Sequence, residues 1–227
     1  MRGAIELVLF DLDGTLVETA PEICDAVNDT LLALDLPPAS LAQVTDWIGH
    51  GTGVLLEQAL ASASGQPLAG LRETSLWRAA QPRFAQDYER RCGTTSRPYP
   101  GARELLRALG EIGIRRALVT NKEQRFTTPV LRRHALRPLL DRVVCGDSLP
   151  TRKPDPAGVL DCLRAFGVPR ERAVFVGDSS IDVATARNAG VPVWALTHGY
   201  NMGEPIASAR PDLLMDRLDA VLDAAIA

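Results

Sequence analysis

The feature that most constrains the fold of this chain is a short apolar run that ends in two carboxylates. Residues 5–10 (IELVLF) are rich in β-forming side chains, so we expect a buried strand there, ended by Gly14. Asp11 and Asp13 follow this strand directly. Ligands of open α/β sheets gather at the carboxyl ends of strands. Because two buried negative charges are costly there, the sequence predicts a compensating cation beside Asp11 and Asp13.

The second half of the chain alternates between strand-like and helix-like segments. The expected strands cover residues 116–120, 142–145, 173–176, 191–196 and 213–215, and the expected helices cover 102–110, 125–134 and 156–166. Strands that alternate with helices are typical of βαβ units. We therefore predict an α/β fold whose core is a doubly wound, Rossmann-like parallel sheet.

Between the first strand and this alternating part lies a stretch with a different pattern. Residues 19–92 contain no clear strand, and apolar side chains such as Ile23, Val27 and Leu31 recur at helical spacing. Two prolines at 37–38 and a glycine-rich segment at 49–53 divide the stretch into several helices. We therefore predict an inserted α-helical cap domain at residues 17–94, with the catalytic core formed by residues 1–16 and 95–227.

Composition excludes several classes of function. The net charge of −3 and an aromatic content of 5% offer neither a basic surface nor a stacking platform for nucleic acid. The four cysteines lack metal-binding spacing, so we expect reduced thiols. No signal peptide or apolar run of membrane length is apparent. We expect a cytoplasmic protein without a membrane partner, and both a monomer and a homodimer remain open.

Polar residues also follow the later expected strands. Thr120 and Asn121 follow the second strand, Lys153 follows the third after a loop, and Asp178 follows the fourth with Asp182 close behind. The carboxyl ends of parallel strands meet at one edge of the sheet, so these side chains are expected to converge with Asp11 and Asp13. Carboxylate-rich sites suit Mg²⁺, and a nearby lysine can hold a phosphate oxygen.

This ordered set of residues resembles the motifs of the haloacid dehalogenase superfamily of phosphotransferases. The matching segments are residues 11–15 (DLDGT), Thr120-Asn121, Lys153-Pro154, and residues 177–179 (GDS) with Asp182. Each segment alone is moderately specific, but all of them occur in order, each after an expected strand. The resemblance extends over essentially the whole chain.

The resemblance implies a role for each of these residues. Asp11 would be the nucleophile that forms an aspartyl-phosphate, and Asp13 would be the general acid and then the general base. Mg²⁺ would be held by Asp11, by the backbone carbonyl of Asp13 and by Asp178, with Asp182 supporting the metal-bound waters. Thr120, Asn121 and Lys153 would bind the substrate, through a hydroxyl, a backbone N–H and an ammonium group respectively.

Further segments are similar to the phosphoglycolate phosphatases within this superfamily. They are residues 47–53 (WIGHGTG), 145–150 (CGDSLP) and 196–201 (LTHGYN); Ile181, where many members have Asn, is a departure. The resemblance implies a Mg²⁺-dependent phosphatase acting on a small phosphorylated metabolite, with 2-phosphoglycolate as the expected substrate. The alternatives are another small sugar phosphate or phosphosugar acid, a phosphomutase, and a non-catalytic phosphate-binding module.

A carboxylate-bearing substrate also requires a positive group on its leaving-group side. The N-terminus of a helix beginning near residues 51–53 could supply backbone N–H groups for an anion. The candidate side chains from the sequence are four arginines: Arg72, Arg78, Arg83 and Arg125.

Overall fold

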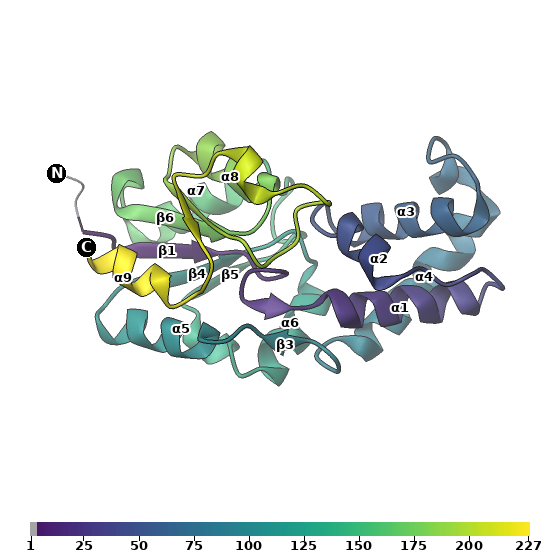
Figure 1. The fold of residues 1–227 in the computed structure, drawn as a ribbon, viewed down its shortest axis with the longest axis horizontal. Coiled ribbons are helices and arrows are strands. Elements are labelled where there is room, and N and C mark those ends of the chain that lie inside the picture. Colours follow the sequence, from purple (N-terminus) through teal and green to yellow (C-terminus); the bar gives the residue numbers. More distant parts are fainter. Residues whose placement is uncertain (1–3) are drawn as a thin grey trace.

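A six-stranded parallel sheet forms the centre of the computed structural model, which describes residues 4–227 (Figure 1). Its strands are β1 (Leu7–Phe10), β4 (Arg115–Val119), β5 (Arg142–Val144), β6 (Ala173–Gly177), β7 (Val193–Leu196) and β8 (Leu213–Met215). They lie in the order β5-β4-β1-β6-β7-β8, and every neighbouring pair is parallel. The predicted doubly wound sheet is thus confirmed, and each expected strand ends within two residues of an observed one.

The strand order changes direction at β1. The chain builds β4 and β5 outward on one side of β1, and then returns to place β6, β7 and β8 on the other side. The carboxyl ends of β1 and β6 therefore lie at the switch point of the sheet, where open α/β folds bind their ligands. Asp11 follows β1 and Asp178 follows β6, so the topology brings these two residues together.

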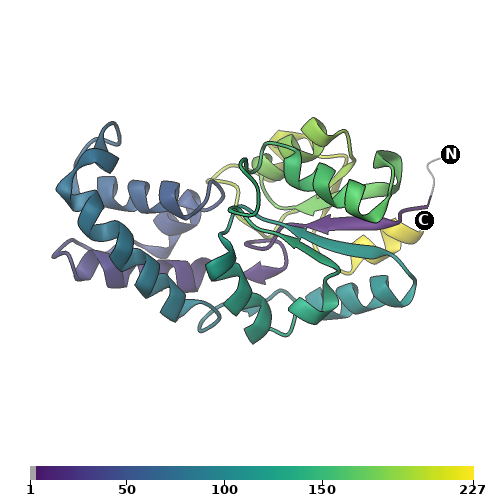
Figure 2. The ribbon, with the colours of Figure 1, turned by 180° about the vertical axis from the view of Figure 1, so that it is seen from behind.

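Helices cover both faces of the sheet (Figures 1 and 2). Side chains of a strand alternate between faces, so Val8 and Phe10 pack on one side while Leu7 and Leu9 pack on the other. The first side is covered by α5 (Ala102–Glu111), α6 (Gln124–Arg133) and α9 (Ala220–Ile226), and the second by α7 (Ala157–Phe166) and α8 (Ser180–Ala189). Short 3₁₀ turns occur at Leu71–Glu73, Arg137–Leu139, Arg170–Arg172 and Ile206–Ala209.

A separate helical body lies beyond the carboxyl ends of the strands (Figure 1). It consists of α1 (Ala20–Leu32), α2 (Leu41–Trp47), α3 (Thr52–Ser64) and α4 (Ser75–Arg91), and it contains no strand within the expected range 19–92. Val27, Leu31, Leu56, Leu60 and Tyr88 belong to an apolar cluster that is formed mainly by these helices and also includes Phe126 of α6 and Tyr200. The apolar side chains that recur at helical spacing give each of these helices one face to bury, and the helices bury these faces mainly against one another.

Two very short strands connect the helical body to the sheet. β2 (Val17–Glu18) leads into α1 and β3 (Arg97–Pro98) follows α4, and the two pair antiparallel, with Val17 opposite Pro98. Two-residue strands produce no alternation that sequence analysis could detect, so this pair was not expected. The predicted domain limits at 16–17 and 94–95 lie beside it, and the division into domains remains a prediction.

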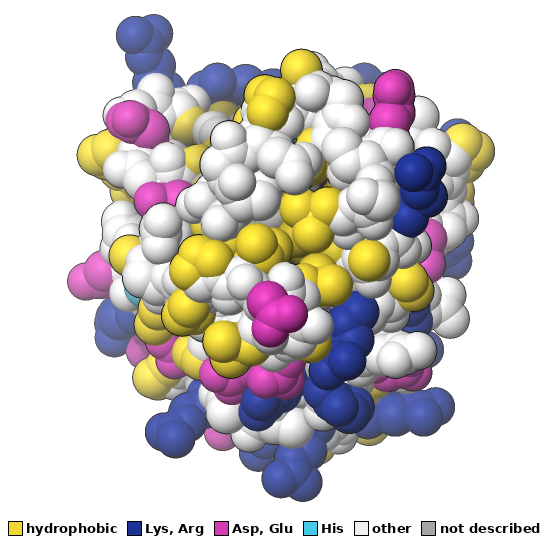
Figure 3. Space-filling view, turned by 90° about the vertical axis from the view of Figure 1, so that its right-hand side faces the viewer, with side chains coloured by type: hydrophobic (Ala, Val, Ile, Leu, Met, Phe, Trp, Pro, Cys, Tyr) yellow, Lys and Arg dark blue, Asp and Glu magenta, His cyan; other side chains and the backbone are white. Residues whose placement is uncertain are grey.

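Other sequence-based expectations concern the thiols and the surface. All four cysteines are free. No helix within residues 4–227 is both long and apolar enough to cross a membrane. Apolar side chains gather at the outer end of the helical body (Figure 3), and Leu32 of α1 is 59% exposed. The cytoplasmic location remains a prediction.

The packing of the central strand predicts a large difference between two leucine truncations. Leu9→Ala removes a fully buried side chain from β1 and should lower the free energy of unfolding by about 2–5 kcal/mol. Leu32→Ala, the control, truncates an exposed leucine and should change it by less than about 0.5 kcal/mol. Urea unfolding followed by circular dichroism measures both. Equal effects would contradict the assignment of β1 to the core.

Candidate active site

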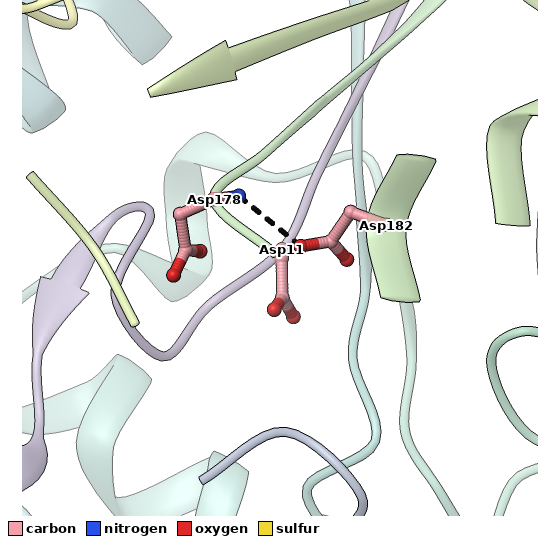
Figure 4. Close-up of side chains that lie close together, drawn as sticks. All are labelled: Asp11, Asp178 and Asp182. Carbon is pink, nitrogen blue, oxygen red and sulfur yellow. Dashed lines mark hydrogen bonds between the residues drawn. The ribbon is translucent and has the colours of Figure 1, made fainter. Parts of the chain in front are cut away.

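Three buried carboxyl groups meet at the carboxyl ends of β1 and β6 (Figure 4). Asp11 follows β1, Asp178 follows β6, and Asp182 lies in the first turn of α8. One carboxylate oxygen of each lies within 4.8 Å of the others, and the carboxyl groups of Asp11 and Asp178 point to the same side. This arrangement could hold a metal ion.

Asp182 fixes the loop that carries Asp178. Its Oδ2 accepts hydrogen bonds from the backbone N–H of Asp178 at 3.1 Å (Figure 4), from the N–H of Ser179 at 3.0 Å and from the Ser179 hydroxyl at 2.7 Å. Ser179 is the N-cap of α8 and forms a reciprocal capping box with Asp182. The helix start therefore sets the position of the Asp178 side chain.

Lys153 is a buried counter-charge shared by two of these carboxylates. Its Nζ donates to Asp182 Oδ1 at 2.7 Å and lies 2.9 Å from Asp11 Oδ1. Asp11 Oδ1 is thus held in an ion pair with Lys153, and this buried oxygen has no hydrogen-bond partner besides it within residues 4–227. Burial would lower the pKa of Lys153, but the attraction of Asp11 and Asp182 outweighs burial and raises it.

Burial has the largest effect on the pKa of Asp11. It raises the pKa of Asp11 to about 7; the attraction of Lys153 opposes this shift, and the repulsion of Asp182 and Asp13 adds to it. The pKa of Asp178 is also raised, by burial and then by repulsion from Asp182 and Asp11. Lys153 alone therefore does not compensate the negative charge at this strand end.

The glycine of the 11–15 segment makes room for Asp178. The Thr15 hydroxyl donates to Asp178 Oδ1, and the N–H of Tyr200 donates to Oδ2 at 2.6 Å. Gly14 has φ +85°, and a Cβ there would lie 2.9 Å from Asp178 Cγ. Both the backbone conformation and the lack of space exclude a larger residue.

Asp13 lies in a different environment from Asp11, although only Leu12 separates them. Its Oδ1 accepts hydrogen bonds from Lys122 Nζ at 2.8 Å and from the Thr19 hydroxyl at 2.7 Å. Lys122 also donates to the hydroxyl of Tyr88, which belongs to α4 of the helical body. Burial would lower the pKa of Lys122, but Asp13 and then Glu22 outweigh it, so this pKa is raised.

Thr120 and Asn121, which follow β4, are predicted to bind the substrate. Both line the same cavity, but their side chains have different partners. Thr120 faces the cavity, and its hydroxyl accepts from the N–H of Lys122 at 3.3 Å. The Asn121 side chain donates to the carbonyls of Gly49 and Lys153, each at 3.0 Å. The side-chain amide of Asn121 therefore connects its own loop to the loops of Gly49 and Lys153. Its backbone N–H is the group that remains proposed to face a substrate.

A cavity lies between the strand ends and the helical body. The sheet side is lined by polar residues: Asp11, Asp13, Thr120, Asn121, Lys122, Asp178 and Ser179. Ile23, Ile48, Leu55, Phe84 and Tyr88 enclose it from the helical body. A small anionic ligand whose non-reacting part is short would fit this combination of polar floor and apolar walls.

None of the four arginines suggested by the sequence lines this cavity. Arg72 pairs with Glu57 at 2.8 Å, and Arg83 pairs with Asp87 at 2.8 Å. Arg125 stacks over the ring of Phe126, its own neighbour in α6. The suggestion that one of these arginines faces the cavity is therefore wrong for this structure, and three of them have partners outside the cavity.

Sequence analysis also missed residues that complete the site. Lys122 follows Thr120-Asn121 directly, but a sequence does not distinguish a buried lysine from a solvated one. Thr15 and Thr19 lie in the segment after Asp13, where neither periodicity nor spacing assigns a role to these two side chains. Tyr88 lies in a helix that the sequence assigned only to the cap, with no signal that its hydroxyl faces the core.

Comparison with known proteins places this site in a family. A family model of haloacid dehalogenase-like hydrolases matches residues 8–196. The chain belongs to this family. Phosphoglycolate phosphatase 1 of Pseudomonas aeruginosa is 42% identical over 96% of this chain and 79% of its own length, and the phosphoglycolate phosphatase of Vibrio cholerae is 38% identical over 97% and 96%. Within the haloacid dehalogenase-like hydrolases, the chain falls in the phosphoglycolate phosphatase family.

Solved structures agree with this placement. The crystal structure of a predicted phosphoglycolate phosphatase from Haemophilus somnus superposes with a TM-score of 0.92 at 35% identity, and the match covers 99% of each chain. The similarity therefore includes the helical body as well as the sheet.

The close contact at Gly14 predicts a matched pair of glycine substitutions. Gly14→Ala should destabilise the fold by at least about 1 kcal/mol, because alanine disfavours positive φ and its Cβ would displace Asp178. Gly53→Ala lies in α3, where a Cβ meets nothing within 4 Å, so stability should stay equal or rise. Chemical denaturation compares the two. A Gly14→Ala protein as stable as Gly53→Ala would refute the packing argument.

Proposed function

We propose that this protein is a Mg²⁺-dependent phosphatase that hydrolyses a small phosphomonoester, with 2-phosphoglycolate yielding glycolate and phosphate as the best candidate. The observation that carries the proposal is the separation of the two carboxylates after β1. Asp11 lies with Asp178 and Lys153, whereas Asp13 has its own partners in Lys122 and Thr19. A nucleophile and an acid–base group need such different surroundings to perform different tasks.

The residues present fit a magnesium ion. The donors are carboxylate oxygens, which hard cations prefer, and Asp11 Oδ1 is a buried oxygen without a hydrogen-bond partner in the described part of the chain. Asp11, Asp178 and the backbone carbonyl of Asp13 would hold the ion. Asp182 is engaged with Lys153 and the Asp178 loop, which supports a secondary role near the metal-bound waters. When bound, the ion would neutralise charge so that a carboxylate can approach an anionic ester.

The reaction would proceed in two steps on Asp11. In the first, a carboxylate oxygen of Asp11 attacks phosphorus, the ester P–O bond breaks, and Asp13 donates a proton to the departing alkoxide oxygen. In the second, Asp13 takes a proton from water, which attacks the aspartyl-phosphate and releases phosphate. Both hydrogen bonds recorded for Asp13 end on Oδ1, which leaves Oδ2 to exchange the proton.

Other residues would hold the transferring group. The Lys153 ammonium lies beside Asp11, and the Thr120 hydroxyl faces the cavity, so both are placed to contact phosphoryl oxygens together with backbone N–H groups near Leu12 and Asn121. Positioned donors of this kind stabilise charge as it develops in the transition state. The helical body would exclude water from the first step.

The family relatives and the small cavity support 2-phosphoglycolate as the substrate. Another small sugar phosphate or phosphosugar acid would use the same residues, and a phosphomutase would transfer phosphate within one sugar instead of releasing it. The carboxylates at 11, 13 and 178 argue against a non-catalytic binding module. A panel of small phosphomonoesters assayed for phosphate release with Mg²⁺ separates these alternatives.

Replacing the proposed nucleophile tests the central step. Asp11→Asn should abolish phosphate release from every substrate, because a carboxamide does not form the aspartyl-phosphate. Phosphate release is measured by a colorimetric assay, and circular dichroism checks that the variant is folded. A folded variant with turnover within about tenfold of wild type would rule out Asp11 as the nucleophile.

Removing divalent ions tests the cofactor. Excess EDTA should stop phosphate release while the circular dichroism spectrum stays unchanged, since apolar clusters on both faces of the sheet stabilise the fold without a metal ion. Mg²⁺ added beyond the chelator should restore activity, and Ca²⁺ serves as the comparison ion. Activity that persists in EDTA would contradict the metal requirement.

A further inference from the structure

Lys122 contributes a positive charge to the interior of the cavity. Among the described residues that line the cavity, no other Lys or Arg is present. Its side chain is only 1% exposed, and its ammonium lies between Asp13 and the hydroxyl of Tyr88. Lys153, by comparison, lies behind Asp11 and next to Asp182, on the side proposed for the phosphoryl group.

The chemistry of 2-phosphoglycolate determines where its carboxylate must lie. Asp13 would protonate the ester oxygen, and a single CH₂ group separates that oxygen from the carboxylate carbon. A group in direct contact with the Asp13 carboxylate is therefore also within reach of the substrate carboxylate. Lys122 Nζ, 2.8 Å from Asp13 Oδ1, is such a group.

We propose that Lys122 binds the carboxylate of the leaving group and so selects acidic phosphomonoesters over neutral ones. The inference rests on the proposed function and deepens it by assigning the substrate-discriminating residue. An ammonium group has three hydrogens, and Asp13 and Tyr88 accept two of them. The third is available to the substrate.

The surroundings make this charge effective. Phe84 and Tyr88 wall the same cavity, so a carboxylate placed there loses water and depends on a charged partner. A neutral leaving group would gain nothing from Lys122. In a variant without the ammonium group, the substrate carboxylate would be buried without a charged partner, so the loss for the acidic substrate should be large.

A second cation near the cavity provides a matched control. Arg152 Nη1 packs against Gly51 closely enough that a Cβ on Gly51 would lie 2.6 Å from it, yet Arg152 does not line the cavity. Because Arg152 directly precedes Lys153 and lies at the edge of the 49–52 loop, it is the alternative candidate for binding the substrate carboxylate. Removing its charge should leave selection for the carboxylate unchanged.

The test compares two substrates that differ in one group: 2-phosphoglycolate and 2-hydroxyethyl phosphate. Steady-state kinetics would be measured for wild type, Lys122→Gln and Arg152→Gln. Lys122→Gln should raise the KM for 2-phosphoglycolate, and its loss of kcat/KM for this substrate should exceed the loss for 2-hydroxyethyl phosphate by at least about tenfold. Arg152→Gln should keep the wild-type ratio.

The outcomes separate this inference from the proposed function. Equal losses of kcat/KM for both substrates in Lys122→Gln would mean that Lys122 acts only through Asp13, and would overturn the carboxylate site while leaving the phosphatase intact. A changed ratio in Arg152→Gln alone would move the site to Arg152. A wild type without preference for 2-phosphoglycolate would overturn both the proposed substrate and this inference.

A second measurement does not depend on Lys122 variants folding. The Asp11→Asn protein, crystallised with Mg²⁺ and 2-phosphoglycolate, should retain the uncleaved ester. The expected structure has a substrate carboxylate oxygen within hydrogen-bond distance of Lys122 Nζ. A carboxylate directed elsewhere, toward the N-terminus of α3 for example, would overturn the assignment.

Discussion

Mutual repulsion among buried carboxylates at the end of β1 is the constraint on which the rest of the site depends. Asp11, Asp178 and Asp182 lie too close together to be stable without positive partners, and Lys153 is shared between two of them. The backbone of the 177–182 turn, the capping box of α8 and the space left by Gly14 all serve to hold these charges in place. The remaining deficit of positive charge is what makes a divalent cation a natural occupant.

The helical body completes a site whose reactive groups come from the sheet. Tyr88 of α4 contacts Lys122, and its ring stacks on Phe126 of α6 with centroids 4.4 Å apart. Asn121 reaches the carbonyl of Gly49, and Thr52 donates to Glu123 at 2.7 Å. The surroundings of Asp13 therefore depend on how the helical body is seated, whereas those of Asp11 depend almost entirely on the sheet.

The periodicity of apolar side chains was sufficient to predict the main strands and helices. The strand at 5–10, the alternation after residue 98 and the helices at 19–92 follow from side-chain periodicity, and the parallel topology then brings Asp11, Lys153 and Asp178 to one edge. Lys122 escaped prediction because its partners, Asp13 and Tyr88, are distant in sequence. The arginines misled for a different reason: a sequence does not show which side chains line a cavity, and the partners of Arg72 and Arg83 lie outside it.

The pairing of β2 with β3 has a consequence for how such a protein can diversify. The chain leaves the sheet region at Val17 and returns to it at Pro98, and these two residues are direct neighbours. The segment between them therefore leaves the sheet region and returns to it at the same place. Insertions, deletions or a different module in this segment would leave the strand order and the cluster of Asp11, Asp178 and Asp182 untouched. The walls of the cavity and the surroundings of Asp13 would change, so this segment can alter the leaving-group side of the site without moving the three clustered carboxylates.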